Sequence, residues 1–215
     1  GETGITMASG LTRITQADLS QELAAHLRFL RQQRGGKRLI LNMRCARGLD
    51  FSGHDLTGAQ FTGADLRDCK FLRSNLSDAI LFGADLSRSD LKQANLTNAD
   101  LRGAQMRAAN FESVDFTRTD LREGHLLHVV EHGDLKHVIN EKTNLLMQGA
   151  VLRHANFTNA KVTSAIGYRT DLSFANFTRA KLNYSDLRNC NFRGAIFENT
   201  DLTGVNFSGA NLQGA

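Results

Sequence analysis

Ala84-Asp85-Leu86-Ser87-Arg88 is followed by two five-residue units of the same kind, Ser89-Asp90-Leu91-Lys92-Gln93 and Ala94-Asn95-Leu96-Thr97-Asn98. In both directions from these units, every fifth residue is large and apolar, without a gap, over sixteen units. The sixteen residues are Phe51, Leu56, Phe61, Leu66, Phe71, Leu76, Leu81, Leu86, Leu91, Leu96, Leu101, Met106, Phe111, Phe116, Leu121 and Leu126. In most units a small residue stands two positions earlier, with Asp or Asn between the two.

A spacing of five fits neither a straight strand nor a helix. On a strand, residues five apart point to opposite faces. On a helix, at about 100° per residue, they are spread around the whole circumference. A chain that turns a corner once in every unit can bury all of them, and four units then complete one coil of 20 residues. The spacing therefore predicts a stack of coils in which Leu76, Leu96 and Phe116 lie one above another.

Units such as Ala64-Asp65-Leu66-Arg67-Asp68 resemble the consensus A-(D/N)-L-x-x of the pentapeptide-repeat family, and about two thirds of the chain shares the pattern. The resemblance implies an all-β solenoid, a right-handed quadrilateral β-helix. The family is functionally mixed, so the resemblance indicates a fold more than a function.

Five segments are expected. Residues 1–14 are interpreted as a vector-derived remnant and flexible leader, and residues 15–36 as an N-terminal capping helix with Thr15 as N-cap and Gly35-Gly36 at its end. A basic partner-binding or membrane-surface helix is the alternative. Residues 37–128 form the first repeat block, 129–149 a non-repeat excursion, and 150–215 the second block.

The excursion shifts the repeat by one residue, since 26 residues separate Leu126 from Leu152. Its apolar residues indicate an ordered short helix or hairpin lying on the solenoid. In the second block, Phe157, Phe177 and Phe197 are expected to stack. Gly167 interrupts the pattern, and we expect a bulge in which Ile166 fills the space that Gly167 leaves.

Composition excludes several classes of protein. The chain of 215 residues has no Pro, no Trp and no apolar run long enough to span a membrane. Net charge is +4, with +5 in residues 1–49, −3 in 50–128 and +3 in 150–215. The three cysteines lack zinc-ligand spacing, and free thiols without a targeting signal favour the cytoplasm.

No catalytic motif is present, and the recurring Asp and Asn are expected to bind backbone groups and not to form an active site. We expect no enzyme activity, no cofactor and no metal. Several histidines lie in or beside the excursion at spacings that would group them on a helix, but neither Cys nor a close acidic residue accompanies them.

A candidate partner-binding surface combines outward apolar residues, two arginines and histidines of the excursion. Ile80 and Phe82 flank the inward Leu81, and Arg102 and Arg122 follow Phe82 at intervals of 20 residues. The alternative is that the excursion packs over them. The full set of candidates is Leu72, Ile80, Phe82, Arg102, Arg122, His128, His132 and His137.

The sequence favours a non-catalytic scaffold that binds an unidentified protein partner, with no membrane and with nucleic acid an improbable partner. The resemblance also implies alternatives, because some family members mimic DNA, bind DNA gyrase and confer quinolone tolerance, and others are secreted bacterial effectors. Nucleic-acid binding through the basic N-terminal region is a further hypothesis. The repeat continues to Ala215, so we expect either an end-to-end homodimer through an open C-terminal coil or further chain.

Overall fold

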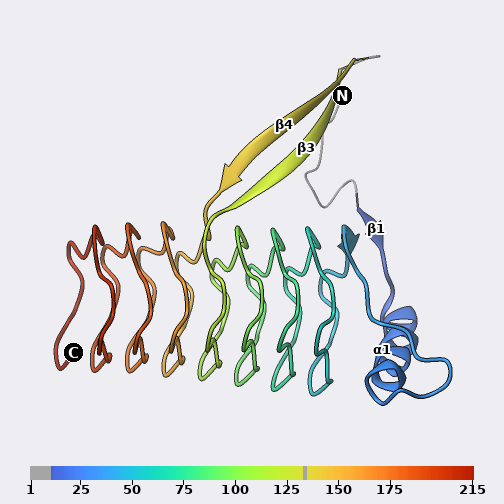
Figure 1. Ribbon diagram of the computed structural model, residues 1–215, viewed down its shortest axis with the longest axis horizontal. Coiled ribbons are helices and arrows are strands. Elements are labelled where there is room, and N and C mark those ends of the chain that lie inside the picture. The colour runs from blue at the N-terminus through green and yellow to red at the C-terminus, as the bar shows by residue number, and fades with distance from the viewer. Residues whose placement is uncertain (1–10, 133–134) are drawn as a thin grey trace.

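The computed structural model describes residues 11–132 and 135–215, and within residues 126–140 it describes only the backbone of the strands (Figure 1). The elements are β1 (Thr12–Arg13), α1 (Gln16–Leu30), β2 (Arg44–Cys45), β3 (Gly124–His132) and β4 (Leu135–Thr143). Among the described residues, no helix has the length and hydropathy that crossing a membrane requires.

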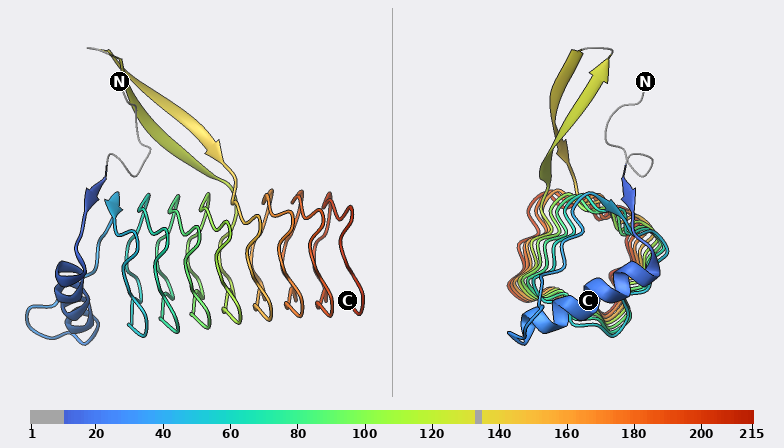
Figure 2. Two further views of the ribbon diagram at one scale, coloured as in Figure 1. Left: turned by 180° about the vertical axis from the view of Figure 1, so that it is seen from behind. Right: turned by 90° about the vertical axis from the view of Figure 1, so that its right-hand side faces the viewer.

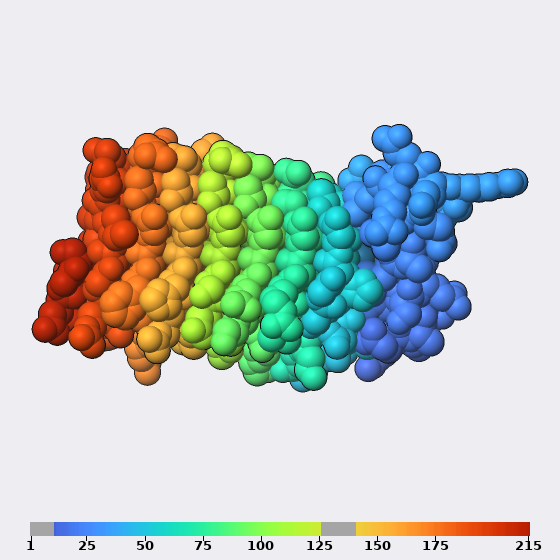
Figure 3. Space-filling model, turned by 90° about the horizontal axis from the view of Figure 1, so that it is seen from below, coloured from blue at the N-terminus to red at the C-terminus, as the bar shows by residue number. Residues whose placement is uncertain are grey.

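Most of the chain forms stacked coils joined by parallel β-bridges between residues 20 apart, as the five-residue spacing predicts (Figure 2). Asn75 pairs with Asn95, and Asn95 pairs with Asp115. Each bridge uses two backbone hydrogen bonds, such as Leu76 N–H to the Asn95 carbonyl (2.7 Å) and Asn95 N–H to the Ser74 carbonyl (3.0 Å). The space-filling view shows the coils following one another in chain order along a rod (Figure 3).

The large apolar residue of each unit fills the interior. Leu76, Leu96 and Phe116 are fully buried, and the small residues two positions earlier face inward beside them. Phe157 stacks on Phe177 with ring centroids 4.9 Å apart, and Phe177 stacks on Phe197 at 5.3 Å, so the predicted phenylalanine column is confirmed. Phe116 extends the column across the interruption of the repeat, 4.8 Å from Phe157.

Most corners are tight turns closed by a backbone hydrogen bond, such as Ala64 N–H to the Phe61 carbonyl (3.0 Å). At Cys69 and Ala165 the backbone N–H donates instead to a serine hydroxyl of the next coil, Ser89 or Ser185. The third residue of the turn has a positive φ, which glycine adopts readily and other residues adopt at a cost. Among residues 11–132 and 135–215, twenty residues other than glycine nevertheless have a positive φ, and all but Gln32 lie at these corners. The Asp or Asn of each unit receives a backbone N–H two residues later, as Asp100 Oδ1 does from Arg102 (3.1 Å), and this confirms its expected role.

Residues 1–10 of the expected remnant and leader lie outside the described residues, but residues 12–14 are more ordered than the sequence suggested. β1 pairs in parallel with β2, and Ile14 is only 3% exposed, so residues 12–14 are not a flexible leader. Thr15 caps α1 by accepting the Asp18 N–H (3.1 Å), but the helix ends at Leu30. It ends before Gly35 because Gln32 takes the left-handed conformation (φ 54°) that closes the C-terminus.

The boundaries of the repeat blocks also differ from those expected. The last large residue of the first block is Leu121, since Leu126 belongs to β3, and the repeat resumes at the buried Leu145 and Met147. The intervening segment is a hairpin that projects away from the coils and does not lie along them (Figure 1). Bridges across it join residues 41 apart, such as Asp115 and Asn156, so the insertion adds 21 residues and shifts the phase by one.

Gly167 is accommodated without a bulge. Its neighbour Ile166 bridges Leu146 and Asp186 at the regular positions, so Ile166 does not fill the interior space. That space is occupied by Met147, because a Cβ on Gly167 would lie 2.6 Å from Met147 Cε.

Helix α1 packs on the first coil through Leu19, Leu23 and His26, all of which are buried. Gln16 makes two hydrogen bonds to the backbone of Asp50, accepting its N–H (2.9 Å) and donating to its carbonyl (3.1 Å). His26 accepts the Leu39 N–H at Nδ1 (2.9 Å), and Nε2 lies 3.0 Å from the Thr57 carbonyl. A backbone N–H can only donate, so His26 is neutral with its hydrogen on Nε2.

Replacing Arg73 by glycine is expected to stabilise the protein. Arg73 is exposed and has φ 53° at a corner, where an L-residue pays roughly 1–2 kcal/mol and glycine pays less than this in chain entropy. We expect Arg73→Gly to raise the free energy of unfolding by about 0.5–1 kcal/mol, measured by denaturant unfolding. The control is Arg193→Gly, because Arg193 is also exposed but does not have a positive φ. This control variant should be less stable than wild type, and an equal loss of stability in both variants would contradict the argument.

The His26 contacts predict a pH-dependent stability. Burial lowers the pKa of the His26 imidazole below its usual 6.5, and the hydrogen bond to Thr57 only partly offsets this. The unfolded chain therefore binds the proton more readily, and stability should fall as pH drops below about 6.5. In thermal unfolding, we expect wild type to be more stable than His26→Gln at pH 8 and this advantage to shrink as the pH falls to 5. The control substitution is His54→Gln, at the same end of the coil stack. A constant advantage would refute this role of His26.

Candidate partner-binding site

The hairpin β3–β4 is the largest departure from the repeat. Its strands pair antiparallel over nine residue pairs, from Gly124 opposite Thr143 to His132 opposite Leu135. The chain leaves the coils after Leu121 and returns at Leu145, at a single corner. Both views in Figure 2 show the hairpin standing clear of the coils. Its two strands form a separate two-stranded sheet and do not pair with the coils along their long edges.

The base of the hairpin lies on the surface that the sequence singled out. The guanidinium of Arg102 stacks over the Phe82 ring, 5.1 Å from its centroid. Gly124 packs against the same ring, since a Cβ there would lie only 2.7 Å from Phe82 Cε2. Gly103 also approaches the hairpin, because a Cβ there would lie 3.2 Å from the Thr143 carbonyl oxygen. The interpretation that the excursion packs over Phe82 therefore holds at the hairpin base.

The arginines of this surface are already paired. Arg102 binds Asp100 through two nitrogens (2.9 and 2.8 Å), and Arg122 binds Asp120 in the same way (2.9 and 2.7 Å). Burial by itself would raise the pKa of Asp120, but its hydrogen bonds to Arg122 and the nearby positive charges outweigh burial and lower it. Each guanidinium is therefore compensated by a neighbouring carboxylate, and the two arginines add little net charge for a partner.

The other candidates are distributed over three places. Ile80, 36% exposed, lies beside Phe82, whereas Leu72 is half-buried on a different wall of the coils. His128 and His132 belong to β3 and His137 to β4, where the register pairs His128 with Ile139 and His137 with Val130. Their side chains lie outside the described residues. The helical spacing considered for the histidines does not apply, because these residues form strands.

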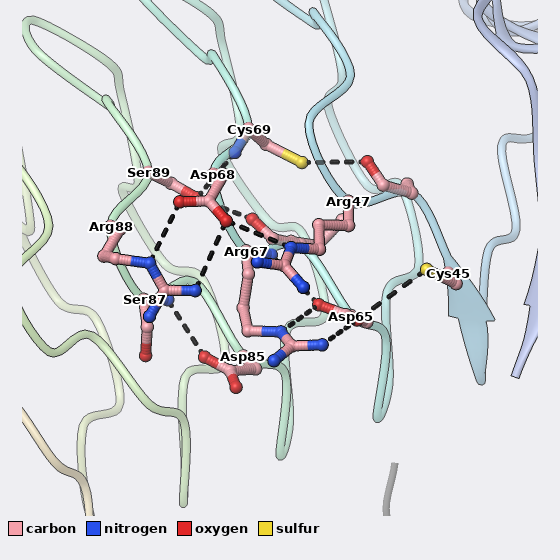
Figure 4. Close-up of polar contacts among 12 residues, drawn as sticks. Cys45, Arg47, Asp65, Arg67, Asp68, Cys69, Asp85, Ser87, Arg88 and Ser89 are labelled. Carbon is pink, nitrogen blue, oxygen red and sulfur yellow. Dashed lines mark hydrogen bonds and ion pairs between the residues drawn. The ribbon is translucent and has the colours of Figure 1, made fainter. Parts of the chain in front are cut away.

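A buried ion pair near the N-terminal end went unrecognised in the sequence (Figure 4). Asp65 is 4% exposed and binds Arg67 through both oxygens (2.8 and 2.7 Å), and the Cys45 thiol lies 3.7 Å from Asp65 Oδ2. Next to it, Asp68 bridges Arg47 (3.1 Å) and Arg88 (3.0 Å).

A sequence signal for such pairs exists. The tripeptide Asp-Leu-Arg occurs four times, and in each case the side chains flanking the inward leucine form a two-point ion pair. The four are Asp65-Leu66-Arg67, Asp100-Leu101-Arg102, Asp120-Leu121-Arg122 and Asp186-Leu187-Arg188. Residues two apart on an extended segment point to the same side, so the pairing follows from the repeat itself.

The cysteines have a structural role. Burial raises the pKa of the Cys69 thiol to about 12, and the thiol donates to the Ala46 carbonyl (3.0 Å). Cys190 is equally enclosed and donates to the Gly167 carbonyl (2.9 Å). Thiols of raised pKa are poor nucleophiles. Among the described residues, no group of three His, Cys, Asp or Glu side chains has an arrangement that could hold a metal ion.

Comparisons with known proteins agree with the repeat pattern. Solved structures similar to this chain include full-length QnrB1, described as a plasmid-mediated fluoroquinolone resistance protein. The two sequences are 24% identical, the match covers 81% of this chain and 82% of that chain, and the TM-score is 0.36. HetL, from the cyanobacterium Nostoc and described as involved in the regulation of heterocyst differentiation, has 20% identity, 93% coverage of both chains and a TM-score of 0.25. At these TM-scores the likenesses support no argument about function.

A comparison with curated protein sequences gives no match. The family model for pentapeptide repeats matches in eight copies, over residues 47–83, 59–98, 84–123 and 180–215. Together these segments make up more than half of the sequence, so the chain belongs to the pentapeptide-repeat family.

Proposed function

We propose that this protein is a non-catalytic scaffold that binds a protein partner through the β3–β4 hairpin and the Phe82 surface at its base. The observation that carries the proposal is the nine-pair ladder that stands clear of the coils. An isolated two-stranded hairpin is only marginally stable in water. A partner strand added to an open edge would supply further backbone hydrogen bonds.

The register of the ladder supports the same proposal. Residues directly opposite each other share one side of a two-stranded sheet. The register pairs His128 with Ile139, His132 with Leu135 and His137 with Val130. Each of these pairs joins a histidine to an apolar residue, a composition that suits contact with a protein surface.

The remaining architecture serves as a rigid support. We infer a right-handed quadrilateral β-helix, as in other members of the family, with α1 as the cap of its first coil. The contacts of Gln16 with Asp50 and of His26 with Thr57 support the cap, because they give partners to backbone groups at the end of the coil stack. Three unpaired, buried cysteines support placement in a reducing compartment such as the cytoplasm.

A DNA-mimicking action on gyrase has less support. Such mimicry needs a surface of unpaired negative charge, whereas Asp65, Asp100, Asp120 and Asp186 are each paired with an arginine. The net charge of +4 also argues against mimicry of DNA, which is negatively charged. The end-to-end homodimer expected from the sequence remains a prediction.

Removing the hairpin should abolish partner binding without unfolding the coils. Deletion of residues 124–144 joins Glu123 to Leu145 and makes Met147 the fifth residue after Leu121, which restores an uninterrupted repeat. Glu123 then occupies a corner of positive φ, so the variant also carries Glu123→Gly. We expect its unfolding temperature to stay close to that of wild type, because no bridge of the coils is lost.

Wild type and the deletion variant are then used as baits in lysate of the source organism. Proteins retained by wild type are purified and tested individually by calorimetry against both. We expect loss of binding in the deletion variant and retention in Leu72→Ser, which alters a different wall. Equal binding to both baits would overturn the proposal, and inhibition of DNA supercoiling by the deletion variant at micromolar concentration would favour the gyrase alternative.

A further inference from the structure

A hollow of about 400 Å³ lies on the second repeat block, lined by Tyr168, Arg169, Arg188 and Asn189. Both arginines stack on the same ring, with guanidinium carbons 5.5 Å (Arg169) and 5.8 Å (Arg188) from the Tyr168 centroid. The hollow is distant in sequence from the hairpin and shares no residue with the Phe82 surface. An inference about it is therefore independent of the proposed function.

The Phe82 surface provides a comparison inside the same molecule. In both places the arginine of an Asp-Leu-Arg unit stacks on an aromatic residue 20 positions earlier, Arg102 on Phe82 and Arg188 on Tyr168. At Phe82 the ring is covered by Gly124 of the hairpin. At Tyr168 a hollow remains, and a second arginine, Arg169, lines it.

Arg169 differs from Arg188 in its charge balance. Arg188 is bound to Asp186 through two nitrogens (2.8 and 2.7 Å), which neutralises it. Among the described residues, no carboxylate forms an ion pair with Arg169, and its exposed guanidinium contacts the tyrosine ring. Its five N–H donors are therefore available to an acceptor other than the side chains that the structure describes.

The hydrogen-bonding groups of the lining residues indicate which class of ligand fits the hollow. Arginine donates only, the Asn189 amide has two donors, and the Tyr168 hydroxyl can donate as well. A lining dominated by donors and carrying one uncompensated positive charge fits an oxyanion. We propose that this hollow binds the phosphate group of a phosphate monoester. Three terminal oxygens match several donors better than the two of a carboxylate, and the volume leaves room for the organic part of the ester.

The corner of the preceding coil contributes to the openness of the hollow. Gly149 stands 20 residues before Arg169 at the same corner, and a Cβ there would contact nothing within 4 Å. The missing side chain leaves open the space on one side of Arg169.

Calorimetry with phenyl phosphate at low ionic strength tests the proposal. We expect saturable binding at one site, weakened at least roughly tenfold in Arg169→Gln because a charge-assisted contact is lost. The matched control is Arg179→Gln, since Arg179 is also exposed at a corner (φ 55° against 60° for Arg169) but donates to Asn159. Gln93 already adopts φ 61° in this protein, so glutamine suits such a corner.

Three further titrations test whether the site recognises a phosphate monoester and not anions in general. Binding should be stronger at pH 7.5 than at pH 5, because the monoester gains its second charge near pH 6. Benzoate should bind more weakly than phenyl phosphate, and inorganic phosphate should also bind more weakly because it lacks the organic part. Equal affinity for benzoate or for inorganic phosphate, unchanged binding in Arg169→Gln, or an equal loss in Arg179→Gln would each overturn the assignment.

Discussion

In each five-residue unit of this protein the chain turns a corner at one residue that has the left-handed backbone conformation, and the rest of the structure depends on that turn. The turn hydrogen bond, such as Ala64 N–H to the Phe61 carbonyl, uses groups that point within the coil. The remaining backbone groups point along the axis and pair with the next coil. Because the chain turns at every unit, an odd spacing can place all large side chains inside.

This geometry separates the residues that make the fold from those free to vary. Inward positions are filled by large and small apolar side chains, and the Asp or Asn before each large residue binds backbone. Variation is then concentrated in the outward positions and at the corners. The ion pairs of the Asp-Leu-Arg units arise there, as do the two aromatic–arginine contacts at Phe82 and Tyr168.

The corner is also where an insertion does least damage. The chain is at the surface there, and a segment can leave and return without removing a bridge. The 21 inserted residues leave Asp115 paired with Asn156 and Phe116 stacked on Phe157 as though no interruption existed. A hairpin placed in this way keeps its position on a rigid body, and Gly124 and Gly103 let its base approach closely.

The sequence by itself determined the 20-residue coil, the inward residues and the backbone role of Asp and Asn, because each follows from spacing alone. It also located the interruption and the residues Phe82, Arg102 and Arg122 on one wall. Only the tertiary structure decided that the excursion is a hairpin standing away from the coils, since its alternation of apolar residues fits several elements. The end of α1 at Leu30 and the filling of the space at Gly167 by Met147 depend on local backbone conformation and on contacts between neighbouring coils. The same is true of Arg169, whose charge no described carboxylate compensates. Such features have no period in the sequence, and a pattern-based argument therefore could not reach them.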